Sequence, residues 1–172
     1  VLDNARQDLP LTAVLTSPFA GLTAAELSVI RLAYPNQLFY EAVEGFCSLS
    51  PEEISETVDK KQAIQVQEKL RKFFEVLDHF REILPYTAIH DLLAEIIDKT
   101  GYGLFISAMP GGAQRQANVE MLVEKARAFE GTSYKGLFNF VRYIEQLKKY
   151  DVDYGEASII DEQDDTVRIM SC

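Results

Sequence analysis

Residues 59–84 read DKKQAIQVQEKLRKFFEVLDHFREIL and decide the fold class of this 172-residue chain. Apolar side chains recur in this stretch every three or four residues, a spacing that places them on one side of an α-helix. They are Ala63, Val66, Leu70, Phe73, Leu77, Phe80 and Leu84. Pro85 follows, and its ring is incompatible with a helix interior. The pattern predicts one long helix from about Asp59 to Leu84 that packs along one side.

Further helices are predicted beyond the long helix, over residues 89–97, 117–129 and 137–147. The first of them ends at Gly101 and Gly103, which suit a helix terminus, and it is expected to lie antiparallel to the long helix. Residues 110–112 (Pro-Gly-Gly) form a turn before the second. Thr132 or Ser133 is the predicted N-terminal cap of the third.

The sequence before the long helix carries a more specific helix signal. Thr23 and Glu26 form a Thr-x-x-Glu capping box, in which each side chain bonds the backbone amide of the other residue. This box predicts a helix that starts directly after Thr23. Asn36 is the expected cap of the next helix, whose apolar stripe covers residues 38–46. A shorter apolar segment, 9–15, precedes both.

Composition argues against several protein classes. With 47% hydrophobic and 26% charged residues, the chain resembles an ordinary globular domain that is long enough to bury a core. No run of 18 apolar residues occurs, so neither a membrane span nor a membrane partner is expected. Cys47 and Cys172 are too few for a disulfide framework, and His79 and His90 offer little to zinc. A reducing compartment, and hence a cytoplasmic location, is expected.

Charge is unevenly distributed along the chain, whose formal net charge is −10. Residues 1–59 carry −7 and residues 151–172 carry −6, whereas residues 60–150 carry +3. The overall acidity argues against a free-standing nucleic-acid binder, because affinity for phosphate comes from Lys and Arg. The basic middle includes a cluster on the long helix, made of Lys60, Lys61, Lys69, Arg71 and Lys72. A solvated helix face is the alternative explanation of this cluster.

The C-terminal residues differ in character from the rest. Residues 151–165 are acidic and lack helical periodicity, and residues 167–170 alternate in the manner of a strand. An isolated strand needs a sheet to join, so its partners are expected outside this sequence. We therefore expect a helical domain over 1–155 and, over 156–172, an acidic linker and the first strand of a neighbouring domain. The chain, which begins at Val1, is expected to be an excised piece of a larger protein.

The candidate catalytic groups have simpler structural explanations. Gly111 and Gly112 precede a helix, but the Lys-Ser/Thr pair of a phosphate-binding P-loop is missing, which favours a plain turn. His79 and His90 lack an accompanying nucleophile or third metal ligand, and Cys47 suits a core position. Three carboxylates that suit a cation equally suit the start of a helix: Glu52, Glu53 and Glu56. No catalytic residue, cofactor site or metal site is predicted.

Aromatic residues are the remaining candidates for a nucleic-acid contact, because exposed rings can stack on bases. Those considered are Phe73, Phe74, Phe138, Phe140 and Tyr143. Their helical spacing favours positions in the core instead.

Several strings are more specific than these general patterns. They are residues 3–11 (DNARQDLPL), 13–15 (AVL), 17–23 (SPFAGLT), 110–118 (PGGAQRQAN), 132–138 (TSYKGLF) and 164–170 (DDTVRIM). In these strings the chain resembles the AddA family of the bacterial AddAB-type ATP-dependent helicase/nucleases, a branch of the UvrD/RecB-like superfamily 1 helicases. The resemblance spans the chain and points to the 2B subdomain, a helical insertion in motor domain 2A.

The resemblance implies a mainly α fold: a helical accessory subdomain with a short terminal strand from the neighbouring motor domain. In UvrD-like relatives, a Gly-Ile-Gly turn resembling a helix-hairpin-helix brings backbone amides to duplex phosphate. The turn that corresponds to it here is Gly21-Leu22-Thr23, in which Thr23 replaces the second glycine. Residues 167–171 resemble the strand that leads into helicase motif V, and the sequence ends before that motif.

The resemblance also implies that the fragment itself is non-catalytic and holds no cofactor. ATP and Mg²⁺ would serve the parent protein, whose Walker motifs, arginine finger and nuclease carboxylates lie outside these residues. The parent is expected to unwind and degrade double-strand ends during recombinational repair. Its implied partners are double-stranded DNA and an AddB-type subunit.

Three functional hypotheses follow. In the first, the fragment guides duplex DNA weakly or regulates the motor, and the DNA-contacting residues are Gly21, Thr23, Lys60, Lys61, Arg71 and Lys72. In the second, it is a protein-interaction module that holds the AddB-type subunit without touching DNA. In the third, it is an independent small enzyme built on His79 and His90.

Overall fold

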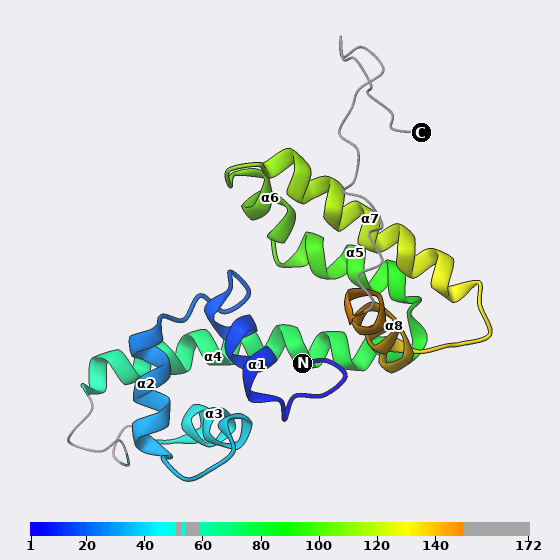
Figure 1. Cartoon of the computed structure of the whole chain (residues 1–172). Helices are drawn as coiled ribbons and strands as arrows, with labels where there is room; N and C mark the ends of the chain where they lie inside the picture. Colours follow the sequence, from blue (N-terminus) through cyan, green and yellow to red (C-terminus); the bar gives the residue numbers. More distant parts are fainter. Residues whose placement is uncertain (51–52, 54–58, 150–172) are drawn as a thin grey trace. The chain divides into compact units, whose positions relative to one another are not determined.

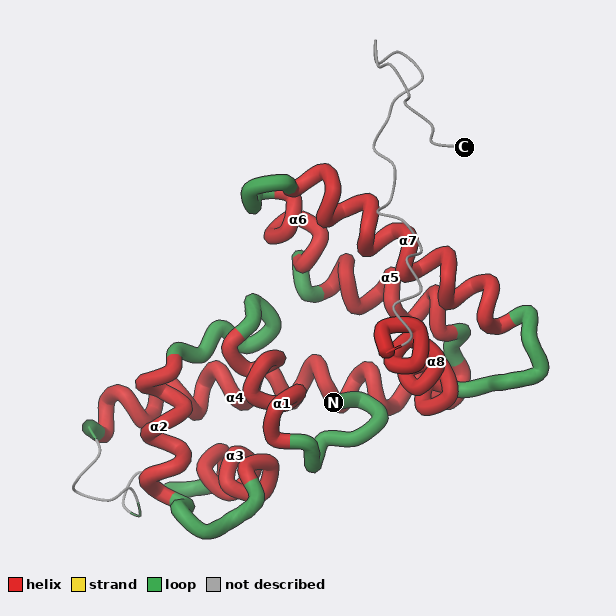
Figure 2. The backbone as a smooth tube through the Cα atoms, viewed as in Figure 1, coloured by secondary structure: helices red, strands yellow, loops and turns green. Residues whose placement is uncertain are grey.

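The computed structural model describes residues 1–50, 53 and 59–149, and within them every regular element is a helix (Figure 1, Figure 2). This confirms the expected mainly α class. The chain divides into two compact units, of which the first ends at Tyr102 and the second begins at Gly103. The elements are α1 (Asp8–Thr16), α2 (Ala24–Ala33), α3 (Phe39–Ser48), α4 (Lys60–Ile83), the 3-10 turn η1 (Leu84–Tyr86), α5 (Ile89–Lys99), α6 (Tyr102–Ser107), α7 (Gly112–Glu130) and α8 (Leu137–Lys149).

Helix α4 is the scaffold of the first unit, as predicted. Asp59 caps it by accepting a hydrogen bond from the Lys61 amide at 3.0 Å. The predicted apolar stripe is buried at Ala63, Val66, Leu70, Phe73, Leu77 and Phe80 and half-buried at Leu84. Helices α2 and α3 pack on α4, and α1 packs on α3 (Figure 1). Each large apolar side chain buried there stabilises the unit by about 1.5–3 kcal/mol.

A buried polar side chain joins α3 to α4. Gln67 of α4 is 3% exposed, and its Nε2 donates hydrogen bonds to the carbonyl oxygens of Phe46 and Leu49, both at 2.9 Å. These carbonyls lie at the C-terminal end of α3, where the Phe46 carbonyl also accepts a longer bond from the amide of the C-cap Leu49 at 3.4 Å. The Gln67 amide therefore completes the end of α3 and is itself satisfied in the core.

The two predicted caps before α4 have different outcomes. The capping box at the start of α2 is confirmed. The predicted Asn36 cap is wrong, because α3 begins at Phe39 and has no side-chain cap. Arg31 accounts for the later start, since its Nη1 donates to the Gln37 carbonyl at 2.7 Å and holds the chain in a turn beyond Asn36.

The six-residue α6 is a helix that the sequence pattern does not predict. The turn from α6 to α7 requires glycine twice, because Gly111 has φ +69° and a Cβ on Gly112 would lie 2.2 Å from the Ser107 carbonyl oxygen. In the second unit, the buried rings of Phe129 on α7 and Phe140 on α8 meet edge-on with centroids 5.5 Å apart. This contact holds the last two helices together.

Helix α8 begins at Leu137, as predicted, but its predicted cap is wrong. It follows Gly136, whose φ is +87°, so a glycine rather than Thr132 or Ser133 occupies the cap position. Thr132 instead closes the preceding helix, where its hydroxyl donates to the Phe129 carbonyl at 2.7 Å.

The predicted strand over 167–170 and the predicted domain boundary near residue 155 lie outside the described residues. The division into 1–155 and 156–172 therefore stays a prediction. Among the helices that the structure describes, none combines the length and the hydropathy needed to cross a membrane.

Candidate functional site

The turn at Gly21 and Thr23 has backbone amides that are engaged within the chain. Gly21 adopts φ +63°, the left-handed conformation that favours glycine. Its amide donates to the Ser17 carbonyl at 2.8 Å, and the Thr23 amide donates to the Glu26 carboxylate at 2.7 Å. A phosphate that approached this turn would meet two amides that already have partners.

A lysine from α4 completes this turn. Lys69 Nζ lies 2.7 Å from Glu26 Oε1 and 3.0 Å from the Gly21 carbonyl oxygen. Burial by itself would raise the pKa of the Glu26 carboxyl, but hydrogen bonds from Lys69 and Thr23 outweigh burial and hold that pKa below its usual value. The N-terminus of α2 thus carries an ionised carboxylate that is paired with an ammonium group.

The four other basic residues assigned to α4 share one side of that helix. Lys60 and Arg71 are eleven residues apart, as are Lys61 and Lys72, which corresponds to about three turns and about 16 Å along the axis. All four side chains are exposed. Across residues 1–50, 53 and 59–149, none of them forms an ion pair with a carboxylate. The structure therefore brings these four predicted residues together and leaves Gly21 and Thr23 on a separate turn.

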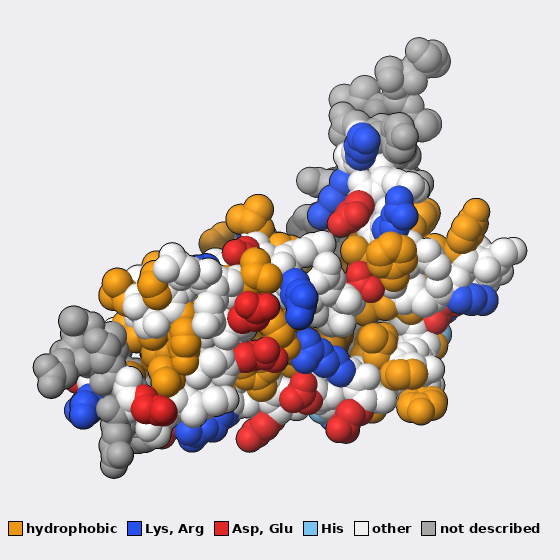
Figure 3. All heavy atoms as spheres, turned by 90° about the horizontal axis from the view of Figure 1, so that it is seen from below, with side chains coloured by type: hydrophobic (Ala, Val, Ile, Leu, Met, Phe, Trp, Pro, Cys, Tyr) orange, Lys and Arg blue, Asp and Glu red, His pale blue; other side chains and the backbone are white. Residues whose placement is uncertain are grey.

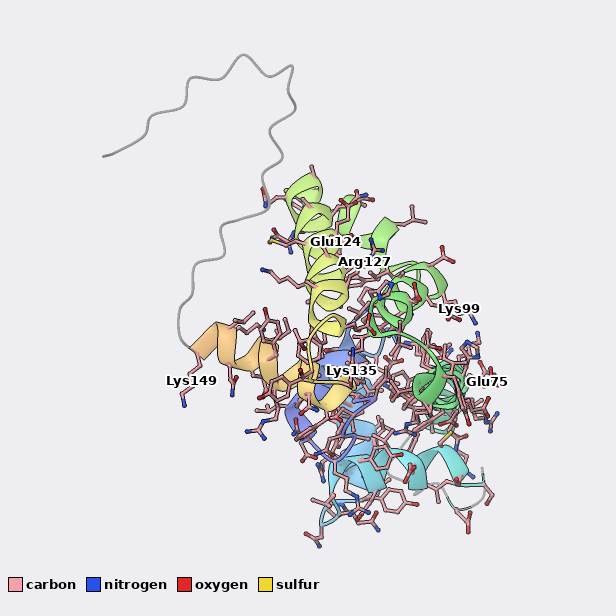
Figure 4. All side chains as sticks on the ribbon, turned by 90° about the vertical axis from the view of Figure 1, so that its right-hand side faces the viewer. Glu75, Lys99, Glu124, Arg127, Lys135 and Lys149 are labelled. Carbon is pink, nitrogen blue, oxygen red and sulfur yellow. The ribbon has the colours of Figure 1, made fainter. Side chains whose placement is uncertain are left out.

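The order of exposed charges along α4 opposes the helix dipole. The exposed cations Lys60, Lys61, Arg71 and Lys72 lie in the first thirteen residues, with Glu68 among them. Exposed carboxylates follow at Glu75, Asp78 and Glu82, and the cation of the last turn, Arg81, is half-buried (Glu75 in Figure 4). The dipole favours the reverse order, and a cation in the first turn costs about 0.3–1 kcal/mol. Helix stability therefore does not explain Lys60 and Lys61. On the face drawn in Figure 3, basic and acidic side chains are interspersed, and neither sign forms an unbroken patch.

The two histidines have separate partners. His79 Nε2 on α4 lies 3.0 Å from Glu95 Oε1 on α5 and 2.6 Å from Lys99 Nζ. His90 Nε2 lies 3.4 Å from Asp91 Oδ1. This geometry gives no support to a small enzyme built on both histidines.

The remaining sequence candidates show no catalytic arrangement in the described residues. Cys47 is half-buried, and burial raises the pKa of its thiol more than the nearby Arg71 lowers it. Glu53 accepts hydrogen bonds from the amide and the hydroxyl of Ser50. Glu52 and Glu56 lie outside the described residues. Where the chain is described, no three His, Cys, Asp or Glu side chains gather as a metal site requires.

The glycine turn before α7 does not fit a nucleotide phosphate. Gly112 packs against the Ser107 carbonyl oxygen, and Arg115, the cation that follows the turn, donates from Nε to the Pro110 carbonyl at 3.2 Å. The turn also lacks the Lys-Ser/Thr pair of a P-loop. An ATP site would therefore have to lie outside this turn.

Sequence reasoning missed an apolar groove between α7 and α8 in the second unit. Its lining residues are Asn118, Met121, Leu122, Lys125, Ile144, Leu147 and Lys148. The helical spacing of Leu122, Ile144 and Leu147 assigned them to the core, but they are only half-buried. The sequence signal for this groove was the pair of apolar stripes on α7 and α8.

Comparison with known proteins confirms the resemblance seen in the sequence strings. The chain is 40% identical to the AddA-type subunit of the ATP-dependent helicase/nuclease from Lachnoclostridium phytofermentans and to that from Oceanobacillus iheyensis, and 39% identical to that from Clostridioides difficile. Each match covers 99% of this chain, but the chain spans only 15%, 13% and 14% of the respective relatives. No family model matches it. Over nearly its whole length, this chain thus matches one segment of the AddA-type subunit of the ATP-dependent helicase/nucleases.

Proposed function

We propose that this chain is a non-catalytic accessory segment of an ATP-dependent helicase/nuclease subunit, in which it guides duplex DNA toward the motor. The observation that carries the proposal is the charge order of α4, because Lys60 and Lys61 lie where the helix dipole disfavours cations. Lys60 and Lys61 have this unfavourable placement and form no ion pair among the described residues. Such a placement is expected where an anion outside the chain pairs with the cations. DNA phosphate is the anion that suits this role.

The four cations on α4 would give a weak, salt-sensitive contact. Neutralising four phosphates of duplex DNA corresponds to a slope of log K against log salt of about −3.6. The net charge of −10 opposes tight binding, so guidance is favoured over anchoring. For Gly21 and Thr23, a DNA contact stays a prediction, because a phosphate would have to displace their bonds to Ser17 and Glu26.

Catalysis belongs, in this proposal, to other parts of the parent protein. ATP and Mg²⁺ would bind there, and unwinding and degradation of double-strand ends during recombinational repair would be activities of the whole protein. Residues 156–172 would lead from the helical segment back to the motor. A cytoplasmic location accompanies this role, because the DNA substrate lies there.

Fluorescence anisotropy of the 172-residue chain with a labelled forked duplex tests the proposal. The combined variant Lys60→Ala, Lys61→Ala, Arg71→Ala and Lys72→Ala should weaken binding and reduce the salt slope by about 3 to 4. The matched control removes the same charge from other exposed positions with Arg6→Ala, Lys99→Ala, Arg115→Ala and Arg127→Ala.

The control variant should retain the slope of the unmodified chain. An unchanged slope in the α4 variant, or an equal loss in both variants, would contradict the proposal. Circular dichroism checks that both variants remain helical, and an ATPase assay of the same chain serves as a blank. ATPase activity in this chain would contradict its non-catalytic role.

One observation favours a second function, in which this chain contacts the AddB-type subunit and does not touch DNA. The groove between α7 and α8 has apolar walls that include Met121, Leu122 and Ile144, and Lys125 and Lys148 flank it. An acidic segment of the partner that carries an apolar side chain fits this groove by charge and hydrophobicity. In the intact two-subunit enzyme, Ile144→Glu should then weaken association of the two proteins without changing DNA affinity. Unaltered association would exclude the groove as that contact.

A further inference from the structure

The structure singles out one of the aromatic residues considered for base stacking. Phe73 and Phe140 are buried, and Phe74 and Tyr143 are half-buried. Phe138, in the first turn of α8, is 54% exposed. It is therefore the ring in this set that a ligand can reach.

Arg142 lies over the Phe138 ring, with its guanidinium carbon 5.7 Å from the ring centroid. The two residues are four apart on α8, so they share one side of the helix. Lys149 continues the same side, because it follows Phe138 by eleven residues, or about three turns. A guanidinium over one face of a ring orients the ring and leaves its opposite face for stacking.

Lys135 extends this side of α8, whereas Lys148 lies about 120° from Arg142 around the helix and lines the groove toward α7. Lys135 precedes the helix, and Lys148 and Lys149 end it (Lys135 and Lys149 in Figure 4). Lys135 Nζ donates to the Glu130 backbone carbonyl, a neutral acceptor that does not compensate the ammonium charge. Lys148 and Lys149 form no ion pair within the described residues, and both also suit the C-terminal end of a helix dipole. The dipole does not account for Lys135 or for Arg142.

We infer that this α8 surface, formed by Lys135, Phe138, Arg142 and Lys149, binds single-stranded DNA. The cations contact successive phosphates, and Phe138 stacks on an unpaired base. Duplex DNA hides the faces of its bases within the stack, so a reachable ring favours a single strand over a duplex. Helix α8 is about 20 Å long, which matches about six stacked nucleotides. The inference rests on the proposed DNA role, but it uses a different unit and a different form of DNA from the α4 contact.

Anisotropy of the 172-residue chain at low salt tests the inference with a fluorescein-labelled single strand and with the duplex of the same sequence. Phe138→Leu keeps apolar bulk but removes the ring, so it should weaken single-strand binding by at least about fivefold. Duplex binding by this variant should stay within about twofold. Phe138→Tyr keeps the ring and should bind the single strand like the unmodified chain.

The salt dependence supplies an independent readout. Arg142→Gln combined with Lys149→Gln should reduce the single-strand salt slope by about 1.4, since each phosphate contact on a single strand contributes about 0.7. The same pair of substitutions leaves the cations of α4 in place. An unchanged single-strand slope would overturn the assignment of Arg142 and Lys149 to phosphate contacts.

The outcomes separate this inference from the proposed function. Weaker single-strand binding by Phe138→Leu, together with unchanged duplex binding by the α4 variant, would support the α8 surface and contradict the α4 contact. The opposite pattern would overturn the α8 surface and leave the α4 contact in place. Equal weakening of single-strand and duplex binding by Phe138→Leu would overturn stacking, and binding to neither DNA would overturn both proposals.

Discussion

The two units of this chain differ in both charge and packing. Residues 1–102 carry sixteen acidic and nine basic side chains, a net charge of −7, whereas residues 103–172 carry eleven and eight, a net charge of −3, with the basic excess confined to residues 103–149. The large buried cluster around α4 belongs wholly to the first unit. In the described part of the second unit, the buried hydrophobic residues are Ile106, Ala126, Phe129 and Phe140. The first unit therefore provides a packed core, and the second provides exposed charge and apolar surface.

This difference shows why net charge along the sequence is a poor guide to function here. The basic stretch 60–150 combines α4, which belongs to the more acidic first unit, with α8, which lies in the basic part of the second unit, residues 103–149. The net charge of −7 on the first unit opposes a contact of α4 with an anion, whereas α8 lies among the excess cations of residues 103–149. We therefore expect the two surfaces to respond differently to the same substitutions.

The largest expected effect is a loss of stability when a buried ring is removed, and it shows whether the two units unfold separately. Phe46→Ala removes a fully buried ring from the first unit and should lower its free energy of unfolding by about 3–5 kcal/mol. Phe140→Ala, in the second unit, should not change the unfolding transition of the first unit. Urea unfolding followed by circular dichroism measures both. If both substitutions shifted one common transition, the two units would be a single cooperative structure.

The next effect concerns the joint between α3 and α4. Gln67→Met should lower the free energy of unfolding of the first unit by about 2 kcal/mol, because the Leu49 carbonyl loses the Gln67 donor and the Phe46 carbonyl keeps only the longer bond from the Leu49 amide. Gln65→Met, at an exposed position of the same helix, is the control and should have little effect. Equal stability of the two variants would show that these carbonyls find another donor. The same urea titration gives the answer.

A smaller effect depends on pH and on Glu26. The pKa of Glu26 is lower in the folded chain, so its ionised form stabilises the first unit above about pH 4.5, and this contribution is lost as the pH falls through the lowered pKa. Glu26→Gln should cost about 1 kcal/mol at pH 7, since Lys69 is 38% exposed and solvent screens the pair. The difference in stability between the unmodified chain and the variant should shrink toward pH 3.

Thermal unfolding at several pH values measures this difference. Glu75→Gln, which changes an exposed carboxylate on α4, is the control. Parallel pH profiles for the unmodified chain and Glu26→Gln would show that the Lys69 pair contributes nothing to stability.

The smallest expected effect is a gain in single-strand affinity that distinguishes the α8 surface from the α4 surface. Glu145 is the acidic residue of α8, and Glu145→Gln should raise single-strand affinity roughly two- to threefold at low salt, because it removes a repulsive charge from the α8 surface. Glu75→Gln removes the same charge from α4 and should change this affinity little (Figure 4). Anisotropy with the single strand measures both. Equal gains would indicate a general effect of net charge instead.

The fold features that the sequence predicts correctly depend on local spacing. The register of α4 follows from its apolar positions, and the capping box at Thr23 follows from a glutamate three residues later. The pair of Lys69 with Glu26 joins residues 43 positions apart, so no local pattern identifies it. The start of α3 likewise depends on Arg31, which reaches across a turn to Gln37.

Helical periodicity in the sequence distinguishes exposed Phe138 from buried Phe140. Phe138 and Phe140 are two residues apart, which places them about 200° apart around a helix. A helix that buries Phe140 must therefore turn Phe138 away from the same neighbour, and this signal was present in the sequence. The charge order of α4 was also readable from the sequence. That Lys60, Lys61, Arg71 and Lys72 form no ion pair with a described carboxylate required the structure.

The hydrogen bonds of the Gln67 amide determine how the chain should tolerate insertions and cuts between α3 and α4. Because a side chain within α4 holds the end of α3, the joint between the two helices does not depend on the length of the chain that connects them. Doubling the length of a connecting loop costs only about 0.6 kcal/mol in closure entropy. Extra residues inserted between Ser50 and Asp59, or a single proteolytic cut there, should leave α3 seated on α4.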